Sequence, residues 1–161
     1  MRSIVYNSSL KTEIGTLFIT ANDKKILGIH FVSDCPPDNE NYLTKALKQE
    51  LVEYFQKKRT TFSTFPLSLS SLEEKIFTKI ITIPYGGTTT YFTLAKELGN
   101  VNDVKEIAKI IQNNPYLILI PCHRVLGKNK SLYNYQAGVK IKEELLKLEQ
   151  DNCLNKKSML N

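Results

Sequence analysis

Residues 114–125 read Asn-Pro-Tyr-Leu-Ile-Leu-Ile-Pro-Cys-His-Arg-Val, and this stretch is the most informative part of the chain. Its apolar run, Tyr116 to Ile120, predicts a buried strand that ends close to Cys122 and His123. The thiolate is the nucleophilic form of cysteine, so a reactive thiol needs a base or a cation nearby. The chain has only two histidines, and one of them directly follows Cys122. The stretch therefore predicts a nucleophilic cysteine at a strand end.

A carboxylate further along the chain completes a candidate triad. On an extended backbone adjacent side chains point apart, so we expect His123 to reach the Cys122 sulfur through a bridging water. Glu149 falls in the same helical row as Ile141 and Leu145, at the edge of an apolar stripe where a carboxylate needs a partner. His123 is the expected partner, which gives a Cys-His-carboxylate site. The alternatives are a structural cysteine and a solvated carboxylate at a helix end.

The composition is that of a compact globular protein. At 161 residues and 42% hydrophobic content the chain can form one domain or two small ones. Its apolar runs are too short to span a membrane, and no apolar signal core follows Met1-Arg2-Ser3. Cys35, Cys122 and Cys153 form no CxxC pair and suit a reducing compartment. We therefore expect a cytoplasmic protein.

The charge balance suggests an anionic partner. Lys and Arg number 22 against 16 Asp and Glu, which gives a net charge of +6 and a pI near 9.1. Nucleic acid is the commonest partner of such a domain, but many basic domains bind nothing anionic. Whether this protein binds nucleic acid therefore depends on where the charged side chains lie.

Turn signals and periodicity divide the chain into two halves. Residues 1–33 alternate as strands do, with a turn at Asn22-Asp23, and residues 43–55 have helical spacing. The polar, Ser/Thr-rich stretch from Lys57 to Ser71 is the expected boundary. The predicted division is residues 1–68, residues 69–153, and a flexible tail, residues 154–161.

The second half predicts a helix-turn-helix. The expected helices are residues 72–81, 91–98 and 104–112, with the turn Gly99-Asn100 between the last two. In the last helix we expect four residues to face inward: Val104, Ile107, Ala108 and Ile111. Lys105, Lys109 and Gln112 then share the opposite face, where they could meet phosphates. The alternative is an ordinary solvated lysine face.

An ordered set of motifs resembles one known family. These motifs are Ile14-Gly15-Thr16-Leu17, Ile83-Pro84-Tyr85-Gly86, Thr90-Tyr91 and the run from Asn114 to Glu149. They resemble the methylated-DNA-protein-cysteine methyltransferases, also called O6-alkylguanine-DNA alkyltransferases. The resemblance implies a mixed α/β fold, with a ribonuclease H-like first half and a winged-helix-like second half. It also implies DNA repair by direct reversal: Cys122 takes an alkyl group from O6-alkylguanine, or from O4-methylthymine, in double-stranded DNA, once per molecule and without a cofactor.

The resemblance also implies roles for further residues. Asn114 should brace the loop that carries the cysteine, Tyr91 should donate a hydrogen bond or proton toward the departing guanine, and Tyr135 should form a pocket wall. Lys105 stands where the family has an arginine that enters the DNA stack, and lysine lacks the planar guanidinium. We assign Arg124 to the structure of the loop.

Two departures from the family pattern stand out. Glu106 replaces a small residue, and a carboxylate is unfavourable near phosphates unless it forms a capping box with Asp103. Lys130-Ser131 replaces a turn that contains glycine, so the family pattern does not determine the shape of the loop before Tyr135.

Two rival functions differ in chemistry. One is a DNA damage sensor that binds alkylated guanine without transfer, although such relatives lack the acceptor cysteine. The other is a cysteine hydrolase that uses Cys122, His123 and Glu149 over many turnovers. His30 and Cys35 lack the spacing of a zinc site, so we expect no metal. No large apolar face is evident in the pattern, so we expect a monomer.

Overall fold

The computed structural model describes residues 4–99, 103–132 and 134–160. The chain divides into two compact units. The first holds Met1–Ser68 with Pro115–Leu119, and the second holds Leu69–Asn114 with Ile120–Asn161. Helices and strands both occur, which confirms the predicted mixed α/β class. In the described part of the chain, no helix is long and apolar enough to cross a membrane.

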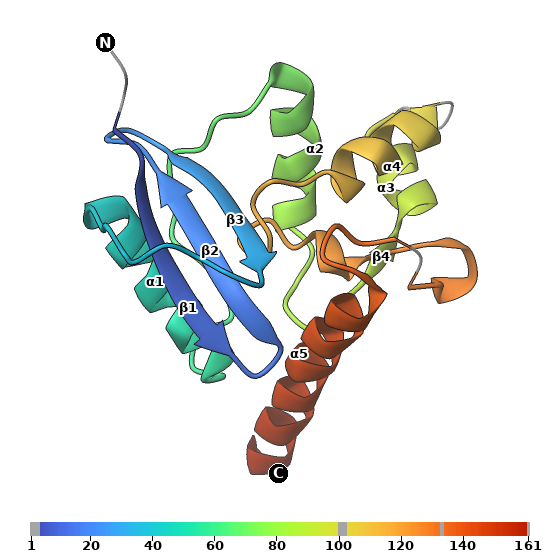
Figure 1. Cartoon of the computed structure of the whole chain (residues 1–161). Coiled ribbons are helices and arrows are strands. Elements are labelled where there is room, and N and C mark those ends of the chain that lie inside the picture. The colour runs from blue at the N-terminus through green and yellow to red at the C-terminus, as the bar shows by residue number, and fades with distance from the viewer. Residues whose placement is uncertain (1–3, 100–102, 133, 161) are drawn as a thin grey trace. The chain divides into compact units, whose positions relative to one another are not determined.

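The first unit is an antiparallel sheet with a helix packed against it (Figure 1). Its strands are β1 (Tyr6–Thr12), β2 (Gly15–Ala21) and β3 (Ile26–Val32), paired in the order β1-β2-β3. The helix is α1 (Tyr42–Phe55), and its start is fixed by a capping box between Asn41 and Thr44. Sheet and helix bury one apolar core, which includes Leu17, Ile19, Ile29, Leu47 and Leu51. The strand alternation and the helical spacing predicted from the sequence therefore meet in this core.

The predicted turn between the second and third strands is confirmed. The Asn22 side chain accepts hydrogen bonds from the backbone N–H groups of Lys24 and Lys25, at 2.8 and 2.7 Å. Such an asparagine-centred turn is stabilised locally, and the Asn41 side chain and the Tyr42 hydroxyl at the start of α1 also donate to its carbonyl groups.

A later segment, residues 115–119, completes the first unit. The Ile29 N–H donates to the Pro115 carbonyl at 2.9 Å, and Ile29 and Tyr116 form one isolated parallel bridge. The segment was predicted to be a regular strand, and this prediction is wrong. The chain turns at Ile118, whose φ is +73°, so the ladder cannot continue.

The second unit is mainly helical. Its helices are α2 (Ser71–Ile81), α3 (Tyr91–Glu97), α4 (Val104–Gln112) and α5 (Val139–Leu160). Two short strands, β4 (Thr89–Thr90) and β5 (Val125–Leu126), pair in parallel, and two 3-10 turns, η2 (Cys122–Arg124) and η3 (Lys128–Lys130), lie in the connections. The three helices predicted before the cysteine are confirmed to within about a residue, and α3 contacts α4 as a helix-turn-helix requires. Asn100 of the predicted turn lies outside the described residues.

Two helix ends differ from prediction. Helix α5 continues to Leu160, so residues 154–160, expected to be part of a flexible tail, are helical. Asp103 is the N-cap of α4, but its side chain makes no capping hydrogen bond, so the predicted capping box with Glu106 does not form. Its backbone, at φ −106° and ψ 23°, is not in the extended conformation that usually presents a capping side chain.

Candidate active site

Cys122 begins the 3-10 turn η2, and the predicted strand end is wrong. The left-handed backbone at Ile118 and the ring of Pro121 interrupt the extended chain before it. The cysteine is 2% exposed. Burial raises the pKa of the Cys122 thiol well above its ordinary value, although a hydrogen bond from Asn114 and the charge of Lys142 oppose the rise. The thiol therefore needs a proton acceptor before it can act as a nucleophile.

Glu149 is fully buried on α5, where three groups hold its carboxylate. His123 Nε2 lies 2.6 Å from Oε2. Arg124 donates from Nε to Oε1 at 2.8 Å and from Nη2 to Oε2 at 3.0 Å, and the Gly86 N–H donates to Oε1 at 3.1 Å. Burial favours the protonated acid, but the charges and hydrogen bonds of His123 and Arg124 outweigh it and hold the pKa of Glu149 far below its usual range. The carboxylate is therefore ionised and compensated at neutral pH.

The contact with Glu149 fixes the tautomer of His123. Because a carboxylate accepts, Nε2 carries the proton, and Nδ1 is the acceptor nitrogen. Nδ1 is buried without a hydrogen-bond partner, so it makes no direct hydrogen bond to the Cys122 sulfur. We expected this separation from an extended backbone, whereas the backbone here is a 3-10 turn. Burial lowers the pKa of His123 more than Glu149 raises it, so the ring is neutral and able to take a proton.

Asn114 lies just after α4 and is fully buried. Its Nδ2 donates to the Ile120 carbonyl at 2.9 Å, and its side chain also hydrogen-bonds to the Cys122 thiol. This geometry is what the predicted bracing role requires, because one side chain ties the loop before the cysteine and also contacts the sulfur.

Lys142 is a fully buried lysine on α5. Its Nζ donates to the carbonyls of Val125 at 2.7 Å and Asn134 at 3.4 Å, and lies 5.9 Å from the centroid of the Tyr91 ring. Burial lowers the pKa of Lys142 to about 8, with Cys122 opposing that fall. The ammonium is thus largely protonated at neutral pH and favours the thiolate of Cys122.

Two tyrosines bring phenol groups to the same site. Tyr91 is 7% exposed, and burial raises its pKa while a hydrogen bond with the Gln112 side chain opposes the rise. The Tyr135 hydroxyl is buried without a hydrogen-bond partner, and burial, with Cys122 and Glu149 nearby, raises its pKa well above the ordinary value. Both phenols keep their protons at neutral pH, so each can donate to a group that enters the site.

A cavity of about 920 Å³ opens at the start of α3. Its lining comes from the end of β4, from α3 and α4, and from the loop after β5: Thr90, Tyr91, Phe92, Val104, Lys105, Ala108, Gln112, Gly127, Lys128, Asn129 and Ser131. Its size is within the range of small-molecule sites. Tyr91 lines it and interacts electrostatically with Cys122, whereas Cys122 is not itself a lining residue.

The polar face predicted for α4 is only partly correct. Lys105 and Gln112 line the cavity, but Lys109 does not. Val104 and Ala108, which were expected to face inward, also line it, while Ile107 and Ile111 are buried as predicted. The cavity therefore exposes an apolar part of the helix that the periodicity had assigned to the core.

In the loop after β5, two residues that are not glycine have a glycine-like backbone. Asn129 and Lys130 have φ values of +58° and +61°, in the left-handed region. Replacing the glycine of the family pattern has therefore not removed the turn, although a side chain there costs about 1 kcal/mol or more.

Three contributors to the site were missed. Arg124, assigned to loop structure, clamps Glu149 and also donates from Nη1 to the Ile83 carbonyl at 2.9 Å. Lys142 stands seven residues before Glu149, and a lysine in that apolar stripe was a readable signal. The third contributor is the backbone N–H of Gly86, which donates to Glu149 and could not be predicted from any side chain. Within the described residues, no three His, Cys, Asp or Glu side chains gather as a metal site.

The fold and the site together define a protein with a buried cysteine, a neighbouring histidine base, and a helix-turn-helix that carries a cavity. Residues 71–151 match the family described as 6-O-methylguanine DNA methyltransferase, DNA binding domain. Residues 5–69 match 6-O-methylguanine DNA methyltransferase, ribonuclease-like domain. The chain belongs to this family, as the resemblance predicted.

Relatives and solved structures agree with this membership. A methylated-DNA-protein-cysteine methyltransferase of Methanosarcina barkeri is 31% identical over 160 residues, covering 92% of this chain and 99% of the relative. The constitutive enzyme of that name from Bacillus subtilis is 33% identical over 160 residues, covering 90% and 95%. The crystal structure of Mycobacterium tuberculosis O6-methylguanine methyltransferase has the same fold, with a TM-score of 0.81 at 23% identity over 92% of this chain and 94% of that one.

Proposed function

We propose that Cys122 accepts the alkyl group of O6-alkylguanine in double-stranded DNA, once per molecule. Membership of the family and its relatives' names support DNA repair by transfer to a protein cysteine, and this is the activity of the chain. The observation that carries the role of Cys122 is the neighbouring imidazole: His123 is neutral, fixed on Glu149, and has a buried acceptor nitrogen.

The first step is removal of the thiol proton. His123 Nδ1 takes the proton, through an intervening water because no direct hydrogen bond exists, and the ring becomes an imidazolium stabilised by Glu149. Arg124 keeps Glu149 in place and ionised, so the proton stays on the ring. Lys142 and the Asn114 amide favour the resulting thiolate.

The second step is displacement at the alkyl carbon. A new bond forms between the Cys122 sulfur and the carbon, the carbon–O6 bond breaks, and its electron pair stays with the guanine. Tyr91, protonated because its pKa is raised, donates toward the guanine and neutralises the charge that develops there. Tyr135 brings a second buried hydroxyl near Cys122, although it is not among the residues that line the cavity. The product is a thioether, which simple thiol exchange does not reverse, so each molecule reacts once.

DNA is the partner of the second unit. The alkylated oxygen lies inside the duplex, so the nucleotide must be extruded into a pocket at a cost of a few kcal/mol in stacking. The cavity beside Tyr91 is the candidate pocket, and Lys105 on its wall can enter the space that the nucleotide leaves or meet a phosphate. The match of residues 71–151 to a DNA binding domain supports this arrangement.

The test is intact-mass analysis after incubation with duplex DNA that carries one O6-methylguanine. We expect a gain of one methyl group on the peptide that contains Cys122, and none with undamaged DNA or with Cys122→Ala. Cys153→Ala and Cys35→Ala are matched thiol controls and should gain the methyl group as the wild type does. No gain despite binding would indicate a sensor, and repeated turnover of an acyl substrate without DNA would indicate a hydrolase.

The proposal includes three further predictions, which concern a second substrate, the oligomeric state and the location in the cell. Activity on O4-methylthymine is tested by the same assay with that base. A monomer is tested by analytical ultracentrifugation. A cytoplasmic location is supported by three free cysteines, Cys35, Cys122 and Cys153, and is tested by cell fractionation.

A further inference from the structure

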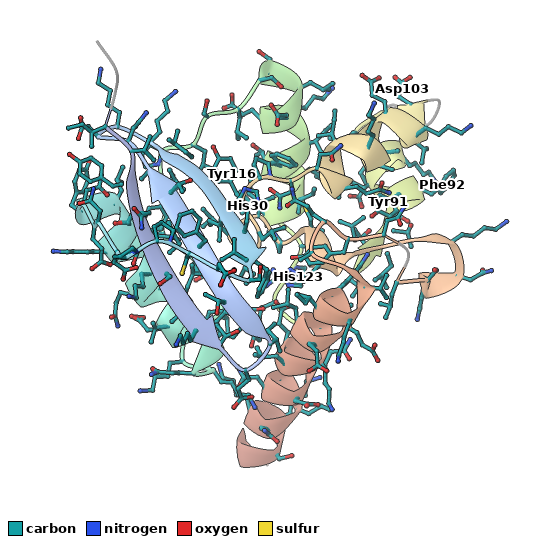
Figure 2. All side chains as sticks on the ribbon, viewed as in Figure 1. His30, Tyr91, Phe92, Asp103, Tyr116 and His123 are labelled. Carbon is teal, nitrogen blue, oxygen red and sulfur yellow. The ribbon has the colours of Figure 1, made fainter. Side chains whose placement is uncertain are left out.

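Phe92 is an exposed aromatic residue on the rim of the cavity. Helix α3 buries Tyr91, Leu94 and Ala95, whereas the Phe92 side chain is 57% exposed and points outward in Figure 2. One exposed apolar side chain is ordinary on a protein surface. Phe92 differs from the others because it lines the same cavity as its neighbour Tyr91.

The surroundings of Phe92 fit one kind of ligand. Lys105 from α4 and Lys128 from the loop after β5 line the same cavity. Two lysines beside an apolar ring are suited to bind a nucleic-acid strand. The phosphates of the strand would contact the lysines, and a base or sugar would cover the ring. The family match places this helix pair in a DNA binding domain.

The chemistry of extrusion supplies a reason for the ring. Drawing a nucleotide out of the duplex leaves its neighbours without a stacking partner. Lys105 supplies charge and length but no planar group. An aromatic side chain offers such a plane, and stacking on one contributes about 1–3 kcal/mol per base.

We propose that the Phe92 ring packs flat against the nucleotide next to the extruded one and so supplies the planar contact that Lys105 lacks. This rests on the proposed function, because it assumes that the cavity receives the extruded base. Phe92 then contributes affinity for DNA, while the chemistry at Cys122 does not depend on it.

The experiment measures binding to duplex DNA with one O6-methylguanine, in a Cys122→Ala background that prevents transfer. Phe92→Ala should weaken binding by roughly fivefold to a hundredfold. Phe92→Tyr keeps the plane and should bind within about twofold of the parent, whereas Phe92→Leu keeps apolar area without the plane and should be weakened. Leu154→Ala, on α5 and 61% exposed, is the control and should have no effect.

Salt dependence separates this contact from the phosphate contacts. Phe92→Ala should lower affinity equally at low and high salt, because no counterion is released at an uncharged ring. Lys105→Ala should reduce the slope of log affinity against log salt by about one. A changed slope in Phe92→Ala would mean that the substitution disturbs the lysines, and would overturn the proposal.

A transfer assay separates this proposal from the proposed function. With Cys122 intact, Phe92→Ala should slow transfer from limiting duplex, and saturating duplex should largely restore the rate, because the lost contact weakens binding of DNA. If the wild-type protein accepts no alkyl group from the duplex, the proposed function fails while the binding result still decides the role of Phe92. Unchanged DNA binding by Phe92→Ala, or parental binding by Phe92→Leu, would overturn the planar contact.

Discussion

Replacing Lys142 with methionine should remove a pH-dependent instability that the buried ammonium imposes on the folded protein. The side chain is fully buried, and its pKa falls from 10.5 to about 8. At about 1.4 kcal/mol for each pH unit, this difference corresponds to about 3 kcal/mol. The methionine keeps the length and apolar volume of the stem, so the ammonium is the main group lost.

The sign of the effect follows from proton binding. Below pH 8 both the folded and the unfolded chain hold the Lys142 proton, and the folded state carries the full cost of the buried charge. Between pH 8 and pH 10.5 the folded state loses the proton first, so the unfolded state binds more protons and stability rises with pH. The Lys142→Met variant has no such titration.

Urea unfolding at a series of pH values measures the effect. The unfolding free energy of the wild type, minus that of Lys142→Met, should rise by about 2 to 3 kcal/mol between pH 7 and pH 10. Groups that titrate alike in both proteins cancel in this difference. A difference that stays flat over this range would refute the reasoning. The variant should also transfer more slowly, about tenfold for each pH unit by which the thiol pKa rises.

Three other substitutions test the site. Glu149→Gln leaves the buried Arg124 without its carboxylate, so the free energy of unfolding measured by urea titration should fall by roughly 3 to 5 kcal/mol. Transfer should slow at least about a hundredfold. A fully stable variant would contradict the importance of the buried Arg124–Glu149 pair. Gly86→Ala forces a side chain into a backbone with φ +78° and places Cβ 2.5 Å from the Cys153 sulfur, so its thermal midpoint should drop, and adding Cys153→Ala should recover only the steric part. Tyr91→Phe should slow transfer from duplex by about a hundredfold in single-turnover assays and change DNA affinity little, and an unchanged rate would exclude Tyr91 as the proton donor.

Local patterns predicted most of the secondary structure. The period of the apolar residues gave α1 to α4, and the asparagine turn gave the β2-β3 hairpin, because these signals lie within a few residues of one another. The run from Tyr116 to Ile120 was misread as a strand, since its backbone is set by contacts with β3, about ninety residues earlier. An apolar run shows that a segment is buried but not whether its backbone is extended.

The site was also predicted only in part, because local patterns reveal some of its residues and contacts between distant segments determine the others. Glu149 was found because its row on α5 was apolar, and the same argument applied to Lys142 would have found the second buried charge. The clamp by Arg124 could not be predicted, because it depends on how η2 meets α5. The resemblance supplied Asn114, Tyr91 and Tyr135, which periodicity alone assigns to ordinary packing.

The segment 115–119 has a consequence for how this chain can be divided. Asn114 and Ile120 belong to the second unit, and the Asn114 side chain joins them, yet the five residues between them fold in the first. Within the first unit, the Tyr116 hydroxyl donates to the Ile26 carbonyl at 3.0 Å and accepts from the Ser68 N–H at 2.9 Å.

A fragment that begins at Leu69 would keep this loop but lose its sheet partner, and would leave a buried tyrosine and three buried aliphatic residues, Leu117, Ile118 and Leu119, without that partner. The DNA-binding half therefore cannot be transplanted as a contiguous piece of gene. An engineer would first have to redesign five residues that end just three positions before the nucleophile.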